Sequence, residues 1–156
     1  MIDTDVAALL ESGCSTVACT VDDTGAPDAT RVWGVSVLED RCHVRALLGA
    51  DEPSVLANLL RTQVIAITAT QVVTLESVQL KGRAVAIEPE SDDDRERRRR
   101  FTREFFAKIH EADGHPVELL ERLVPSAGVA VVVRADAVYD QTPGPGAGRE
   151  IARRDR

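Results

Sequence analysis

Short runs of β-branched and small apolar residues recur along the chain, and they constrain its fold more than any other feature. In the clearest runs apolar and polar side chains alternate, which is the period of a β-strand with one buried face. Polar turn segments such as DDTGAP at 22–27 separate the runs. The predicted strands span residues 15–21, 30–38, 41–48, 64–70, 74–87 and 129–138. Gly82 is placed to let the long fifth strand bend.

Helical periods interrupt this strand pattern. The main helix is predicted over 91–113, because Phe101, Phe105 and Ile109 recur every four residues among charged side chains. Ser91 and the aspartates after it suit the start of this helix, and Gly114 suits its end. Shorter helices are predicted over 3–12, 53–60 and 117–124. Six strands with hairpin-length links and few helices predict a mainly β protein, a closed or partly closed antiparallel barrel.

The bulk composition describes one ordinary globular domain. A chain of 156 residues with 44% apolar and 29% charged residues can bury a core of its own. We expect a single domain over 1–148 and a charged tail over 149–156. The net charge of -7 argues against nucleic acid as a partner. No apolar run is long enough to span a bilayer and no leader pattern opens the chain, so we expect a cytoplasmic protein without a membrane partner.

Cysteine and histidine spacing gives no sign of a metal or hydrolytic site. Cys14, Cys19 and Cys42 form no Cys-x-x-Cys pair, which argues against a disulfide framework or a zinc site. The three histidines have no partner at a catalytic or metal-ligand spacing. Arginines crowd residues 95–103, but interleaved glutamates favour a solvated helix with internal ion pairs.

Four segments in order resemble a known family. They are VDDTGAPDATRVWG at 21–34, NLLRTQVIAI at 58–67, SVQLKGRA at 77–84 and DQTPGPGAG at 140–148. Together they resemble the pyridoxamine 5′-phosphate oxidase-like FMN-binding split-barrel family, and QTPGPGAG is similar to the C-terminal motif of one branch of it. The resemblance implies an antiparallel six-stranded Greek-key barrel that pairs as a homodimer with FMN at the interface.

The resemblance also implies a function. The expected protein is an FMN-dependent oxidoreductase acting on an unidentified small-molecule substrate, with hydride chemistry at the flavin and no nucleophilic side chain. Catalytic residues stay unassigned. The alternatives are a non-catalytic flavin-binding or sensing module, and the same barrel holding F420 or haem. The loop 141–148 is expected to fold over the flavin mouth of the partner subunit.

The resemblance places the cofactor on particular residues of this sequence. The implied cofactor-binding residues are Arg31, Val32, Trp33, Gly34, Ser54, Asn58, Ser77, Gln79 and Lys81. Arg31 suits binding of the phosphate, and Gly34 allows the backbone to approach the flavin ring closely. The row that carries Gln79 and Lys81 could hydrogen-bond the ring carbonyls and favour an anionic reduced flavin.

Each of these residue types would also suit a purely structural role at its position. Arg31 could be an edge arginine beside a core Trp33, and the row with Gln79 and Lys81 could be a plain solvent face. Ser54 could cap its helix, and Asn58 could be a structural hydrogen bonder. The sequence leaves these alternatives open.

Overall fold

The computed structural model describes residues 1–154 and contains strands and helices in the predicted order. The helices are α1 (Thr4–Glu11), α2 (Pro53–Thr62), α3 (Asp92–Asp113) and α4 (Val117–Leu120), the last continuing into the 3-10 turn η1 (Glu121–Leu123). The strands are β1 (Ser15–Val21), β2 (Pro27–Val37), β3 (His43–Gly49), β4 (Val64–Thr70), β5 (Ser77–Pro89), β6 (Gly128–Asp140) and β7 (Glu150–Arg153).

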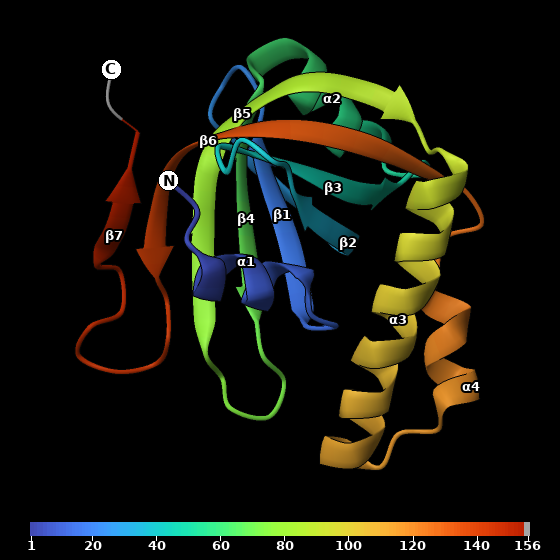
Figure 1. The fold of residues 1–156 in the computed structure, drawn as a ribbon. Coiled ribbons are helices and arrows are strands. Elements are labelled where there is room, and N and C mark those ends of the chain that lie inside the picture. The colour runs from blue at the N-terminus through green and yellow to red at the C-terminus, as the bar shows by residue number, and fades with distance from the viewer. Residues whose placement is uncertain (155–156) are drawn as a thin grey trace.

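Strands β1 to β6 close into an antiparallel barrel (Figure 1). Their order is β3-β2-β1-β4-β5-β6, and pairing of β3 with the first half of β6 closes the cylinder. Strand β7 pairs with the far end of β6, outside the barrel. The six-stranded antiparallel barrel expected from the sequence is therefore confirmed.

Several strands begin elsewhere than the pattern predicted, because turn chemistry sets their ends. The strand predicted from residue 41 begins at His43, because the Asp40 carboxylate accepts hydrogen bonds from the backbone amides of Cys42 and His43 and holds this segment in a turn. The strand predicted from residue 74 begins at Ser77, after a turn in which Leu75 has a left-handed φ of 61°. Gly82 adjoins a bulge whose extra residue is Asp136 of β6, and a second bulge places its extra residue, Val85, on β5 itself.

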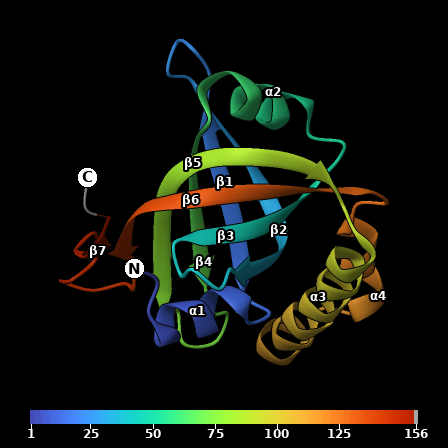
Figure 2. The ribbon, with the colours of Figure 1, turned by 45° about the horizontal axis from the view of Figure 1, so that its top comes forward.

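The barrel interior is aliphatic. Inward residues of every strand form one buried cluster, and α1 and α2 supply Val6, Leu10, Val55 and Leu59 to it. Figure 2 shows these two helices at opposite ends of the barrel. Each helix therefore closes one end of the core.

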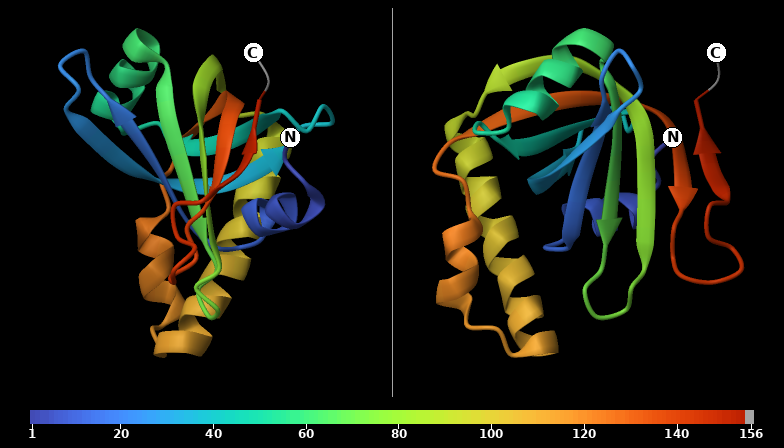
Figure 3. Two further views of the ribbon diagram at one scale, coloured as in Figure 1. Left: turned by 90° about the vertical axis from the view of Figure 1, so that its left-hand side faces the viewer. Right: turned by 180° about the vertical axis from the view of Figure 1, so that it is seen from behind.

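The long helix α3 leaves the barrel and packs along its side with α4 (Figure 3). Its predicted ends are confirmed: Ser91 and Asp94 form a capping box, and Gly114 ends the helix with a left-handed φ of 71°. A second, aromatic cluster of Trp33, Phe105 and Phe106 fills the space between β2 and this helix. Helix α3 thus covers part of the outer surface of β2.

The C-terminal segment is partly sheet. The expected tail at 149–156 contains β7, whose residues pair with β6, whereas residues 155–156 lie outside the described part of the chain. Strand pairing rather than charge orders residues 150–153. No helix within residues 1–154 has the length and apolar character needed to cross a membrane.

Candidate functional site

The outward side of β1, β4 and β5 forms a surface of small and polar side chains, which we call the outer face. Its residues are Val17, Cys19, Ala66, Thr68, Gln79 and Lys81. The registers place Val17, Thr68 and Gln79 in one row across the strands, with Cys19, Ala66 and Lys81 in the next. The barrel thus presents a floor of short side chains with polar groups along one edge.

Arg31 of β2 lies at the other end of the first row, opposite Val17. Its guanidinium carbon stands 5.9 Å from the Trp33 ring centroid and 5.3 Å from that of Phe105. Stacking on these rings buries one edge of the side chain, and its Nη1 has no hydrogen-bond partner among residues 1–154. Burial lowers the pKa of this guanidinium, although arginine stays charged.

Gln79 and Lys81 mark the opposite edge of the outer face. The Gln79 amide donates to Thr68 Oγ1 at 2.9 Å, which holds the amide flat against the sheet. The Lys81 ammonium lies over the Tyr139 ring, 4.8 Å from its centroid, and is exposed. Because neighbouring strands lie about 4.8 Å apart, Arg31 and Gln79 are separated by about 14 Å across three strand spacings.

The other predicted residues of β2 and β5 serve the barrel itself. Val32 points into the core and is 1% exposed, while Trp33 anchors the aromatic cluster. Gly34 lies where an added Cβ would stand 3.1 Å from the Leu47 side chain, a close internal approach. The Ser77 hydroxyl is buried and bonds to Thr70 and to the Leu75 carbonyl. Trp33 is therefore a core anchor, as one of the two interpretations expected.

The two candidates on α2 are apart from the outer face. Ser54 is exposed in the first turn, and the cap position belongs to Glu52, so the interpretation of Ser54 as the helix cap is wrong. The Asn58 amide is buried and donates to Thr20 Oγ1 at 3.1 Å, joining α2 to β1. Of the nine candidates, Arg31, Gln79 and Lys81 lie on the outward side of the barrel, with Arg31 and Gln79 at opposite ends of one row.

A groove of about 480 Å³ runs along the outer face toward β7, and we call it the outer groove. Lys81 is the one predicted residue that lines it. Sequence reasoning missed Cys19, Tyr139 and Arg153, which also line it. The alternation in the first strand groups Cys19 with Val17 and Val21 and would favour an inward position, whereas the structure exposes Cys19. No local pattern joins residues from β1, β6 and β7.

Several cations face this groove. Lys81 has no acidic partner among residues 1–154, and Arg83 donates only a long bond of 3.4 Å to the Thr62 carbonyl. Arg153 instead pairs with the Glu150 carboxylate, whose pKa is lowered by that contact. The groove can therefore receive an anionic group near Lys81 and Arg83.

The arginines near the start of α3 are largely committed to structure. Arg98 makes a two-pronged contact with the Glu90 carboxylate at 2.7 and 2.9 Å and a bond to the Pro125 carbonyl. Pairs within the helix, as expected, join Arg95 to Asp92 and Arg99 to Glu96. Arg98 differs from the expectation because its partners precede and follow the helix in sequence.

Comparison with solved structures identifies the fold. No family model and no curated protein sequence matches this chain. An FMN-binding protein from Syntrophomonas wolfei matches in structure with a TM-score of 0.53 and 13% identity, covering 87% of this chain and 86% of that one. The chain has the split-barrel fold of the pyridoxamine 5′-phosphate oxidase-like proteins.

Two further solved split barrels resemble it. An F420 reductase matches with a TM-score of 0.51 and 17% identity, covering 84% of this chain and 93% of that one. HutZ, the heme storage protein from Vibrio cholerae, matches with a TM-score of 0.50 and 12% identity, covering 89% of this chain and 94% of that one. The structural matches show a common fold, and at identities this low they show the fold alone. The cofactors that these three neighbours are named for differ.

Proposed function

We propose that this protein binds FMN on the outer face and is an oxidoreductase acting on a small molecule. The observation that carries the proposal is the buried Nη1 of Arg31, a cationic donor that has no hydrogen-bond partner within residues 1–154 and lies beside a floor of small side chains. An unpaired buried donor is costly, and an anionic oxygen would satisfy it. The residues present therefore fit a phosphorylated, flat cofactor.

Each part of the outer face has a separate task in this proposal. Arg31 would hold the phosphate, and the short side chains of Val17, Cys19 and Ala66 would leave room for a planar ring system. Gln79 and Lys81 would face polar atoms of the ring, where a positive charge favours an anionic reduced form. When bound, FMN would supply hydride exchange with the substrate. The chain itself would bind and orient the cofactor and place positive charge beside its ring.

A second copy of the chain would complete the site. The outer face is only partly covered in one chain, and Val64 beside it is 39% exposed. A partner placed there would exclude water from a bound ring and form the cleft for substrate. The homodimer is thus part of the proposal.

F420 is the second candidate, because the cations Lys81 and Arg83 continue along the outer groove and suit a longer acidic cofactor tail. Haem would find no histidine among the described residues that line the outer groove, so its iron would need Cys19 or Tyr139 as a ligand. A non-catalytic flavin module would use the same face without a substrate cleft.

The test is titration of the purified protein with FMN, followed by absorbance and by addition of NADH or NADPH. We expect Arg31→Ala and Lys81→Ala each to weaken FMN binding by about 1 to 3 kcal/mol, because each removes a charged hydrogen-bond donor. Arg122→Ala, an exposed change on η1, is the matched control. Unchanged affinity in both variants, or protein that takes up no FMN, contradicts the proposal. Tighter binding of F420 than FMN selects the second candidate.

A further inference from the structure

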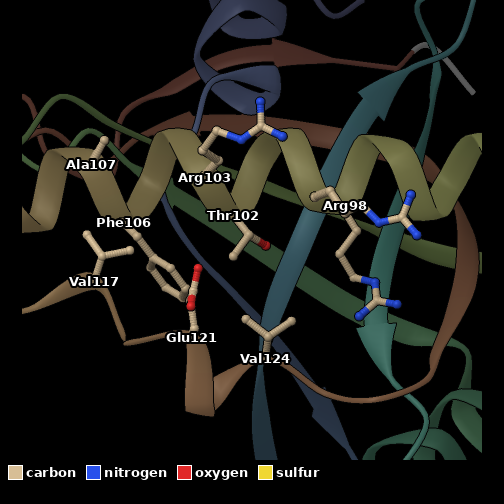
Figure 4. A pocket seen from close by; sticks show the side chains of 9 residues that line it. Arg98, Thr102, Arg103, Phe106, Ala107, Val117, Glu121 and Val124 are labelled. Carbon is tan, nitrogen blue, oxygen red and sulfur yellow. The ribbon is translucent and has the colours of Figure 1, made fainter. Parts of the chain in front are cut away.

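A separate cavity of about 520 Å³ lies between α3 and the segment formed by α4 and η1 (Figure 4), and we call it the α3–α4 cavity. Phe106, Val117 and Val124 form most of its apolar lining. It shares no lining residue with the outer groove. Its occupant is therefore a question apart from the proposed flavin site.

Thr102 places a polar atom in this apolar space. The residue is 8% exposed, and its Oγ1 has no hydrogen-bond partner among residues 1–154. A threonine within a helix commonly bonds to the carbonyl four residues earlier, but this hydroxyl makes no such bond, and its side chain lies on the side of α3 that faces η1 (Figure 4). A buried hydroxyl left unpaired destabilises the protein, whereas a ligand oxygen would satisfy it.

The charges around the α3–α4 cavity nearly balance. Glu90 neutralises Arg98 and Glu96 pairs with Arg99, which leaves Arg103 and Glu121 among the lining residues. Glu121 extends from η1 on the wall opposite α3 (Figure 4). A site with one cation and one anion gives little advantage to a charged ligand.

We propose that the α3–α4 cavity binds a small uncharged molecule that has an apolar ring and one hydroxyl group. The ring packs on Phe106, Val117 and Val124. The ligand oxygen accepts a hydrogen bond from Thr102, and its proton is donated to the Glu121 carboxylate. A hydroxyl group suits this pair because it is both an acceptor and a donor.

The probe is 4-ethylphenol, with ethylbenzene as the matched ligand that lacks the hydroxyl. Trp33, the only tryptophan, has its ring centroid 6.4 Å from that of Phe106, so its fluorescence reports on the cavity. We expect 4-ethylphenol to change this fluorescence saturably and to bind more tightly than ethylbenzene. Calorimetry on the same protein gives the dissociation constants.

Variants locate the binding. Thr102→Val keeps the shape but removes the hydroxyl, so 4-ethylphenol should bind about tenfold more weakly while ethylbenzene binding is unchanged. Thr102→Ser should retain tight binding, and Thr4→Val, an exposed change on α1, is the matched control. Ala107→Phe should abolish binding of both probes by filling the cavity.

Three results would overturn the inference: no saturable binding of 4-ethylphenol by the wild-type protein, equal affinity in wild type and Thr102→Val, or unchanged binding in Ala107→Phe. Each of these measurements omits FMN. Failure here is therefore distinguishable from failure of the flavin proposal.

Discussion

At the scale of single residues, the same chemistry can serve the fold or a ligand, and hydrogen-bond partners separate the two. Asn58 and Ser77 have protein partners, so their polar groups are already used by the fold. Arg31 Nη1 and Thr102 Oγ1 are buried without such partners in the described part of the chain, and each lies at a place proposed to receive a ligand. An unsatisfied buried atom is thus the most informative residue-scale signal in this protein.

Asp94 provides a residue-scale prediction about stability. Its buried carboxylate accepts two hydrogen bonds from Arg45, at 2.9 and 2.7 Å, and also caps α3. We expect Asp94→Ala to lower the free energy of unfolding by about 3 kcal/mol in urea titrations, because it leaves Arg45 with Glu88 alone. Asp93→Ala, an exposed change in the same helical turn, should have little effect.

The same pair predicts how stability changes with pH. The Arg45 guanidinium holds the pKa of the Asp94 carboxyl well below its usual range. A depressed folded pKa adds stability above the unfolded value of about 3.9, and this stability is lost as the pH falls below that value. Urea titrations from pH 5 to pH 2 should show a steeper loss for wild type than for Asp94→Asn. Parallel curves would contradict this assignment.

At the scale of elements, Gly82 lies where β5 pairs with two strands at once. It pairs with Ile65 of β4 on one side and with Ala135 of β6 on the other, beside a bulge whose extra residue is Asp136 of β6. The backbone of β6 comes so close that a Cβ on Gly82 would meet the Arg134 carbonyl oxygen at 2.0 Å. Only glycine fits there without displacing a strand.

We therefore expect Gly82→Ala to lower the unfolding free energy by about 1 to 3 kcal/mol, since the added methyl must push β5 from β6. Gly146→Ala is the matched control. Its Cβ would meet only the Asp140 carboxylate at 3.8 Å, so the change should stay within about 0.5 kcal/mol. Equal effects at the two positions, measured by urea unfolding, would show that the close approach is not what requires glycine.

At the scale of the whole molecule, the partly covered outer face predicts pairing. Cys19 is exposed on the outer face, and its neighbours on the adjacent strands are Ala29 and Ala66. An arginine at this position therefore has room in a single chain but would block a second chain from packing against this face. We expect Cys19→Arg to convert a wild-type dimer to a monomer in sedimentation experiments and to weaken FMN binding at least tenfold. Leu119→Arg, on the exposed side of α4, should leave the mass unchanged. A monomeric wild type that still binds FMN would remove the dimer from the proposal.

Local sequence determined much of this protein. Strand alternation identified the inward residues of β5, and capping residues marked both ends of α3, because these signals depend on neighbours a few positions apart. In β1 it did not, because the buried residues are Thr16, Ala18 and Thr20 while the more apolar row of Val17, Cys19 and Val21 faces outward. Barrel closure decided the rest. It set the register that aligns Arg31 with Gln79, and it brought Arg45 to Asp94 across 49 positions. Such contacts depend on which strands become neighbours, and no local period specifies that choice.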